Sequence, residues 1–215
     1  MLKQLFRPRG GRGPFAPILD YDENVLWHER ELEPRVASAL EELTWAEPFE
    51  SQAMLDVLEP DLDAFLRPVS NPLAREFLEQ DIASLARSLG AAMGRRHLHG
   101  QLAIMARDGC RKFHADNVSL RLLCTYVGPG TEWIPNENVE RRNLARTDVD
   151  FETANRSVLR RPDGVRRCGA GDILILKGEA FDRNRGSGAV HRSPPIVEHE
   201  LRRLVFKLDE SPCGC

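Results

Sequence analysis

The chain has 215 residues, of which 41% are hydrophobic and 29% are charged. This length suits one domain, and the composition is that of an ordinary globular protein rather than a disordered one. Lysine and arginine together number 30 against 33 acidic residues, which gives a formal net charge of −3. This balance gives no reason to expect nucleic acid or an anionic membrane surface as a partner.

The sequence also bears on location and redox state. It contains no run of 18 apolar residues that could cross a membrane. Scattered positive charge near the N-terminus is not followed by an apolar segment, so we expect no signal peptide and a cytoplasmic location. Five cysteines are an odd number, and we expect reduced thiols. Two of them, Cys213 and Cys215, lie in a predicted frayed tail, residues 211–215.

The N-terminal part of the chain is predicted to be mostly helical over residues 21–95. Before it, residues 1–20 are rich in arginine, glycine and proline, and we expect a flexible lead. Apolar side chains recur at helical spacing over residues 29–44. A second helical segment is predicted over residues 51–66, with a break at Pro60.

The strongest helix signal covers residues 71–93. Asn71 can cap the first turn, Pro72 suits the first helical position, and Gly94 suits the C-terminal cap. The apolar side chains recur every three or four residues, as on the buried face of a helix. These residues are Leu73, Phe77, Leu78, Ile82, Leu85 and Leu89.

From residue 96 onward the pattern changes to strands and turns. Strands are predicted over residues 97–107, 112–126, 172–177 and 201–208. The polar segment 134–164 is predicted to be a long loop that could close over a pocket. Helices followed by strands indicate an α+β fold, in which the helices pack on one face of a β sandwich or barrel at residues 96–210.

A histidine and an aspartate two residues apart, His114 and Asp116, are the first candidate ligands. Residues i and i+2 of a strand point to the same face, so an imidazole nitrogen and a carboxylate oxygen could reach one metal ion. Taken alone, such a pair more often makes an ordinary hydrogen bond at the end of a surface strand.

A second histidine, His191, lies where a glycine-rich loop meets a predicted strand. Two histidines and one carboxylate on a β scaffold form the facial triad of non-haem Fe(II) oxygenases. Three protein ligands on one face leave three coordination positions open. A structural zinc site, in contrast, usually has four protein ligands in a closed shell.

The last predicted strand contains two adjacent arginines, Arg202 and Arg203. Alternation places Arg202 on the apolar face, together with Leu204 and Phe206, where a buried guanidinium needs a partner. An anionic cosubstrate could be that partner, because a guanidinium can bind a carboxylate through two hydrogen bonds. Alternatively, both arginines face solvent, or Arg202 pairs with an internal acid.

The histidine–aspartate pair, the distal histidine and the final-strand arginine together resemble the core of the 2-oxoglutarate and Fe(II)-dependent dioxygenase superfamily. Four segments also resemble an uncharacterised bacterial family of unknown function: residues 121–126, residues 128–133, the Gly-Asp strand at 171–176 and His-Arg-Ser-Pro-Pro at 191–195. The superfamily resemblance implies a double-stranded β-helix, a cupin-like jelly roll, over residues 96–210.

By this resemblance, His114, Asp116 and His191 would bind Fe(II), and Arg202 would bind the distal carboxylate of 2-oxoglutarate. Three further side chains would line the pocket: Arg121, Thr125 and Tyr126. The implied reaction is an O₂-dependent oxidation, such as a hydroxylation, of an unidentified small-molecule or protein substrate. Because two arginines adjoin, the resemblance leaves open which of them binds the cosubstrate.

Two other functions fit the same ligands. A metal-binding protein of metal homeostasis would hold zinc or another divalent ion without turnover, and it would need no arginine facing the metal. A cupin-like isomerase or hydrolase would use the metal as a Lewis acid. An arginine that points to the metal would favour the oxygenase, whereas a fourth protein ligand would favour metal binding alone.

Overall fold

A six-stranded antiparallel sheet is the largest element of the computed structural model, which describes residues 13–20 and 22–210. In spatial order its strands are β1 (Val25–His28), β7 (Ile173–Lys177), β4 (Leu120–Val127), β9 (Arg203–Asp209), β3 (His97–Met105) and β2 (Glu50–Asp56). A smaller antiparallel sheet contains β6 (Arg166–Arg167), β5 (Glu132–Ile134) and β8 (Val190–Arg192). The α+β class predicted from the sequence is confirmed.

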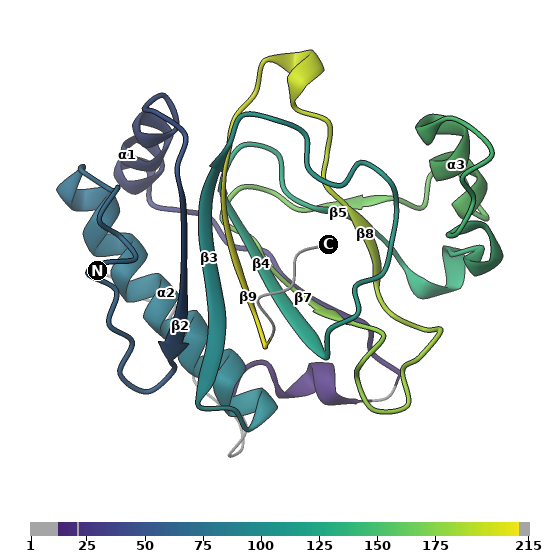
Figure 1. Ribbon diagram of the computed structural model, residues 1–215, viewed down its shortest axis with the longest axis horizontal. Helices are drawn as coiled ribbons and strands as arrows, with labels where there is room; N and C mark the ends of the chain where they lie inside the picture. The colour runs from purple at the N-terminus through teal and green to yellow at the C-terminus, as the bar shows by residue number, and fades with distance from the viewer. Residues whose placement is uncertain (1–12, 21, 211–215) are drawn as a thin grey trace.

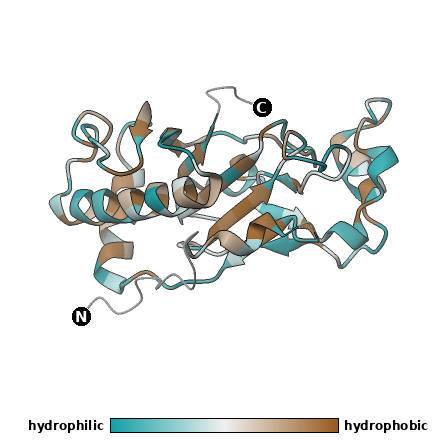
Figure 2. Ribbon diagram, turned by 90° about the horizontal axis from the view of Figure 1, so that it is seen from below, coloured by the Kyte–Doolittle hydropathy of each residue, from teal (hydrophilic) through white to brown (hydrophobic). Residues whose placement is uncertain are grey.

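Two helices cover one face of the large sheet. Figure 1 shows α1 (Pro34–Thr44) and α2 (Pro72–Met93) on one side of β3, β9 and β4, and the small sheet on the other side. Figure 2 shows hydrophobic strands at the centre of the molecule and mixed hydropathy along the helices. The main core therefore lies between the helices and the large sheet, where both contribute buried apolar side chains.

The alternation of side chains gives the large sheet two different faces. In β9, Leu204, Phe206 and Leu208 are buried in the main core. Arg203 and Lys207 point to the other face and line a cavity. One face of the sheet thus supplies the hydrophobic core, and the other carries the polar groups of the candidate site.

The helix α2 begins and ends as predicted. Asn71 Oδ1 accepts hydrogen bonds at 3.0 and 3.1 Å from two main-chain N–H groups of the first turn. Gly94 ends the helix in the left-handed region, with φ at 63°. No helix among the described residues is long and apolar enough to span a membrane.

The helix predicted over residues 51–66 is wrong. Its first part lies in β2, which pairs with β3 along its whole length, and turns follow. Met54 and Leu58 of the supposed apolar stripe are 56% and 58% exposed, whereas Leu55 is buried in the core. Pairing with the edge of β3 thus prevails over an apparent helical period, and residues 21–95 are not mostly helical.

Part of the predicted flexible lead is ordered. Phe15 and Ile18 are buried in the main core around a short 3₁₀ helix, η1 (Ala16–Leu19). The prediction for residues 1–20 is therefore wrong for residues 13–20. Residues 1–12, and the tail with its two cysteines, lie outside the described residues.

The polar segment 134–164 is structured. It contains the helix α3 (Phe151–Val158) and the 3₁₀ helices η2 (Asn136–Asn138) and η3 (Arg141–Asn143); a fourth 3₁₀ helix, η4 (Val197–His199), precedes β9. A small apolar cluster packs α3 against the small sheet, on the side away from the large sheet (Figure 1). None of residues 134–164 is among those that line the cavity, so the expected lid is not found there.

A buried polar cluster joins the helical layer to the sheet. Arg30 donates two hydrogen bonds of 2.7 Å to the carboxylate of Asp81 in α2, and the Tyr126 hydroxyl donates a third, also of 2.7 Å. The side chains of Arg30 and Asp81 are mostly buried. Breaking such a pair leaves a charge without its partner in a medium of low polarity.

We therefore expect Asp81→Asn to lower the free energy of unfolding by about 3–5 kcal/mol. The control is Asp63→Asn, because Asp63 is 92% exposed in its ion pair with Arg75 and such surface pairs contribute about 0–1 kcal/mol. Urea denaturation followed by far-UV circular dichroism measures both. Equal effects of the two substitutions would contradict a structural role for the buried cluster.

Candidate metal centre

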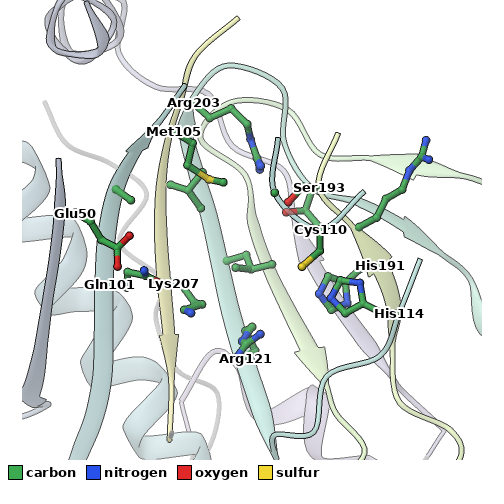
Figure 3. Close-up of a pocket in the computed structure, with 16 residues that line it drawn as sticks. Glu50, Gln101, Met105, Cys110, His114, Arg121, His191, Ser193, Arg203 and Lys207 are labelled. Atoms are coloured by element: carbon green, nitrogen blue, oxygen red, sulfur yellow. The ribbon is translucent and has the colours of Figure 1, made fainter. Parts of the chain in front are cut away.

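The three side chains predicted to bind a metal lie together. His114, Asp116 and His191 each offer one ligand atom, and these atoms lie within 4.8 Å of one another. His114 forms an isolated β-bridge with His191 in β8, through main-chain hydrogen bonds of 3.0 and 2.9 Å. This bridge places the two imidazole rings side by side, with centroids 4.6 Å apart (Figure 3).

The backbone also orients each ring. His114 Nδ1 lies 2.8 Å from the carbonyl oxygen of Lys112, and His191 Nδ1 lies 3.2 Å from that of Ala189. Because a carbonyl oxygen only accepts hydrogen bonds, both Nδ1 atoms carry a proton, and a neutral ring then has its lone pair on Nε2. Metal-binding histidines are usually held in this way.

The two Nε2 atoms face the carboxylate of Asp116. His114 Nε2 is 3.5 Å from Oδ1, and His191 Nε2 is 3.2 Å from Oδ2. A lone pair facing a buried carboxylate oxygen is repulsive unless a proton or a metal ion lies between them. Two imidazole nitrogens and a carboxylate oxygen suit Fe(II) and Zn(II), so these residues fit a divalent metal ion.

Asp116 is held by a buried arginine. Arg121 Nη1 donates to Asp116 Oδ2 at 2.6 Å, and the Nε and Nη2 atoms of Arg121 lie 2.7 and 2.6 Å from Asp209 Oδ2. Burial raises the pKa of Asp116, but the contacts with the imidazoles of His114 and His191 and the positive charge of Arg121 hold this pKa well below its usual range. Asp116 is therefore ionised, as a metal ligand must be.

A cavity of about 230 Å³ extends from the triad along the face of the large sheet that is turned away from the helices (Figure 3). The strands of the large sheet contribute Glu50, Gln101, Ala103, Met105, Arg121, Leu123, Arg203, Val205 and Lys207. Segments on the opposite side contribute Gly109, Cys110, His114, Thr131, His191, Arg192 and Ser193. The two histidines are thus accessible to a ligand in the cavity.

Arg202 does not lie in this cavity, which corrects the prediction from the sequence. β9 begins only at Arg203, and the Arg202 guanidinium donates to the carbonyl oxygens of Thr44 and Ala46 at 2.8 and 2.9 Å. Its guanidinium also lies near the Trp45 ring. Arg202 precedes the strand and therefore does not share the face of its apolar residues.

Arg203 lies in the cavity instead. Its side chain is among the largest that are fully buried, and its Nη2 atom donates to Thr125 Oγ1 at 3.1 Å. Among the described residues, its Nε atom has no hydrogen-bond partner and its guanidinium has no ion pair. Burial lowers the pKa of Arg203 to about 10. A buried cation of this kind is costly unless an anion reaches it.

The other three residues predicted to line the pocket differ in their positions. Arg121 lines the cavity, but its guanidinium is engaged by two carboxylates. Thr125 lies behind Arg203 and accepts its hydrogen bond. Tyr126 points to the opposite face, where its hydroxyl donates to Asp81. Tyr126 is therefore not a cavity residue, because adjacent residues of a strand point to opposite faces.

Several cavity residues were not identified from the sequence. Lys207 could have been found once Arg203 was assigned to the cavity, because the two share a face of β9. Glu50, Gln101 and Cys110 carry no such signal. Their positions depend on the pairing of β2 with β3 and on the path of the chain before His114.

Comparisons with solved structures find a distant likeness to dioxygenases and to a hydroxylase. A dioxygenase for auxin oxidation from rice is 12% identical, with a TM-score of 0.46, over 87% of this chain and 73% of that protein. The Fe(II)/α-ketoglutarate-dependent dioxygenase TqaL is 10% identical, with a TM-score of 0.48, over 90% and 83%. A Pseudomonas putida prolyl-4-hydroxylase is 11% identical, with a TM-score of 0.41, over 89% and 94%.

The family of the chain is defined by its sequence. Residues 13–209 match the family described as protein of unknown function, DUF1826, and the chain belongs to that family. No curated protein matches the chain. The uncharacterised family suggested by the sequence motifs is confirmed.

The contacts of Arg121 predict that Asp209 supports metal binding from outside the ligand shell. Asp209→Asn removes the charge that balances Arg121 beside the metal ligand, so a cation there becomes less stable. We expect binding of Zn(II) or Co(II) to weaken by about 10–100-fold, as measured by titration of the metal-free protein. Asp148→Asn, at an exposed ion pair, is the control. A folded Asp209→Asn protein with unchanged affinity would refute the role of Asp209.

Proposed function

We propose that this protein is a non-haem Fe(II)-dependent oxygenase that uses 2-oxoglutarate as cosubstrate. The observation that carries the proposal is the position of Arg203, a buried guanidinium without an acidic partner among the described residues, in the same cavity as the two histidines of the triad. A ligand that bridges the two must carry a metal-chelating group at one end and an anion at the other. 2-Oxoglutarate meets both requirements.

The ligand set supports a metal with open coordination positions. Among the described residues, the group of potential ligand atoms within 4.8 Å of one another has three members, His114, Asp116 and His191. Three ligands from one side favour a catalytic site over the closed shell of a structural zinc site. When bound, Fe(II) would supply the redox chemistry that couples O₂ to oxidation of cosubstrate and substrate.

Arg203 would bind the distal carboxylate of 2-oxoglutarate. Its free Nε and the Thr125 hydroxyl, which already accepts a hydrogen bond from Arg203, offer donors to one carboxylate group. The neutral walls beside Arg203, such as Val205, exclude water from this contact and strengthen it. Arg203 therefore takes the role that the resemblance assigned to Arg202.

We further propose that the two sheets form a double-stranded β-helix whose core is residues 96–210. The strand order β7-β4-β9-β3 would be one half, and β6-β5-β8 with the bridge at His114 would be the other. The cavity lies between these halves, since both contribute lining residues. β1, β2 and the helices would then extend and cover one half.

The decisive test is anaerobic addition of Fe(II) and 2-oxoglutarate to the metal-free protein. We expect the weak visible charge-transfer band of the chelated oxoacid, because the triad leaves adjacent coordination positions open. The band should be lost in His114→Ala. Tight zinc binding without any band would refute the oxygenase and favour a metal-binding protein.

The adjacent arginines offer a matched pair of variants. Arg203→Gln should weaken 2-oxoglutarate binding by at least about 30-fold, since losing one partner of a buried charge pair costs 2 kcal/mol or more. Arg202→Gln should leave the affinity unchanged, because its guanidinium binds carbonyl groups near Trp45. Titration of the charge-transfer band measures both. A loss of affinity confined to Arg202→Gln would overturn the assignment.

A further inference from the structure

A second cation in the cavity, Lys207, has no partner in the part of the chain that the structure describes. It lies in β9 on the same face as Arg203, four residues further along the strand. Across residues 13–20 and 22–210, its ammonium group makes neither a hydrogen bond nor an ion pair. Four residues of a strand span roughly 13 Å along the backbone, and Figure 3 shows the Lys207 and Arg203 side chains apart from each other, which suits two separate anionic groups.

Gln101 lies directly opposite Lys207. The two are paired residues of β3 and β9, and both side chains line the cavity. The Gln101 amide likewise has no hydrogen bond to the described part of the chain. Figure 3 shows Gln101 and Lys207 next to each other, away from both Arg203 and the two histidines. An ammonium and an amide N–H group can thus reach one ligand group together.

Apart from Arg203, the arginines of the cavity are paired with acidic residues of the protein. Arg121 contacts Asp116 and Asp209, and Arg192 donates to Glu132 at 2.6 Å. Under the proposed function, one carboxylate of 2-oxoglutarate would bind the metal and the other would bind the unpaired Arg203. The charge of Lys207 then remains without an anion.

Glu50 is the acidic residue that could compete for Lys207. It lies on β2, and β3 separates that strand from β9. Its side chain is exposed and accepts a hydrogen bond from Gln52, and no ion pair with Lys207 occurs among the described residues. Solvent screens the charge of Glu50, so it does not replace an anion bound next to Lys207.

We infer that Lys207 and Gln101 form the subsite for a carboxylate group of the substrate. One ammonium supplies one charge, and the two side chains supply donors for two oxygens, which suits a carboxylate better than a phosphate dianion. The cavity walls beside this subsite include Ala103, Leu123 and Val205. The substrate class is therefore a small carboxylic acid with an aliphatic part. This assignment rests on the proposed function for the places of metal and cosubstrate.

Butyrate and its uncharged isostere butyramide test the subsite. The protein is saturated with Zn(II) and 2-oxoglutarate, so that Arg203 is occupied and no turnover occurs, and binding is followed by saturation-transfer NMR. Butyrate should bind at least about tenfold more tightly than butyramide, because a hydrogen-bonded charge pair contributes that much or more. Lys207→Gln should abolish this preference and leave 2-oxoglutarate affinity as in the wild type.

Two further variants sharpen the result. Gln101→Leu should weaken butyrate binding less than Lys207→Gln does, because it removes a neutral donor only. Glu50→Gln should preserve the preference for butyrate. If butyrate binds tightly only in the Glu50→Gln variant and not in the wild type, Glu50 is the partner of Lys207 and the inference is overturned. Equal binding of the two probes, or a Lys207→Gln protein that binds butyrate normally, also overturns it.

Failure of the subsite and failure of the proposed function give different results. If Lys207→Gln weakens 2-oxoglutarate binding as Arg203→Gln does, Lys207 belongs to the cosubstrate site and the inference fails while the oxygenase stands. If Fe(II) and 2-oxoglutarate give no band, the same probes are titrated into metal-free Arg203→Gln protein. A preference for butyrate that depends on Lys207 then supports the anion subsite without the oxygenase.

Discussion

The contact between Arg121 and its two carboxylates is the interaction on which the site depends. Arg121 and Asp209 are paired residues of β4 and β9, so their ion pair is fixed by the centre of the large sheet. Through Arg121 the sheet holds Asp116, which belongs to the segment that bridges to β8. One guanidinium thus links the two sides of the cavity, and the position of the carboxylate ligand follows from the pairing of two central strands.

The two histidines are placed by a different device. Their main chains pair directly, and each ring is oriented by a carbonyl oxygen two residues before it. Backbone geometry therefore fixes both nitrogen ligands, whereas a side-chain ion pair fixes the oxygen ligand. Main-chain pairing and one ion pair thus bring His191 next to His114 and Asp116, which lie far from it in the chain.

The sequence was informative where local chemistry decides the outcome. The caps of α2 are properties of neighbouring residues, and they appear in the structure as expected. His114 and Asp116 do lie together, but the strand predicted over residues 112–126 begins only at Leu120, so an isolated bridge and an ion pair position them instead. The sequence was misleading where strand pairing decides. The apolar residues of β2 are spaced as in a helix, but the segment pairs with β3. β9 begins at Arg203, so Arg202 lies outside the strand in which it was predicted. The partner of a strand is set by distant residues, which a single sequence does not reveal.

The two faces of β9 contact different parts of the protein, and this separation determines how substitutions and shifts in the strand act. The residues that pack against the helices are interleaved with those that face the cavity, but they contact different parts of the protein. A substitution at Lys207 alters what the cavity attracts without disturbing the core. A shift of the strand by a single residue would exchange the faces and destroy both. A point substitution on the cavity face of β9 therefore changes the cavity and leaves the core in place, whereas a change of register would affect both at once.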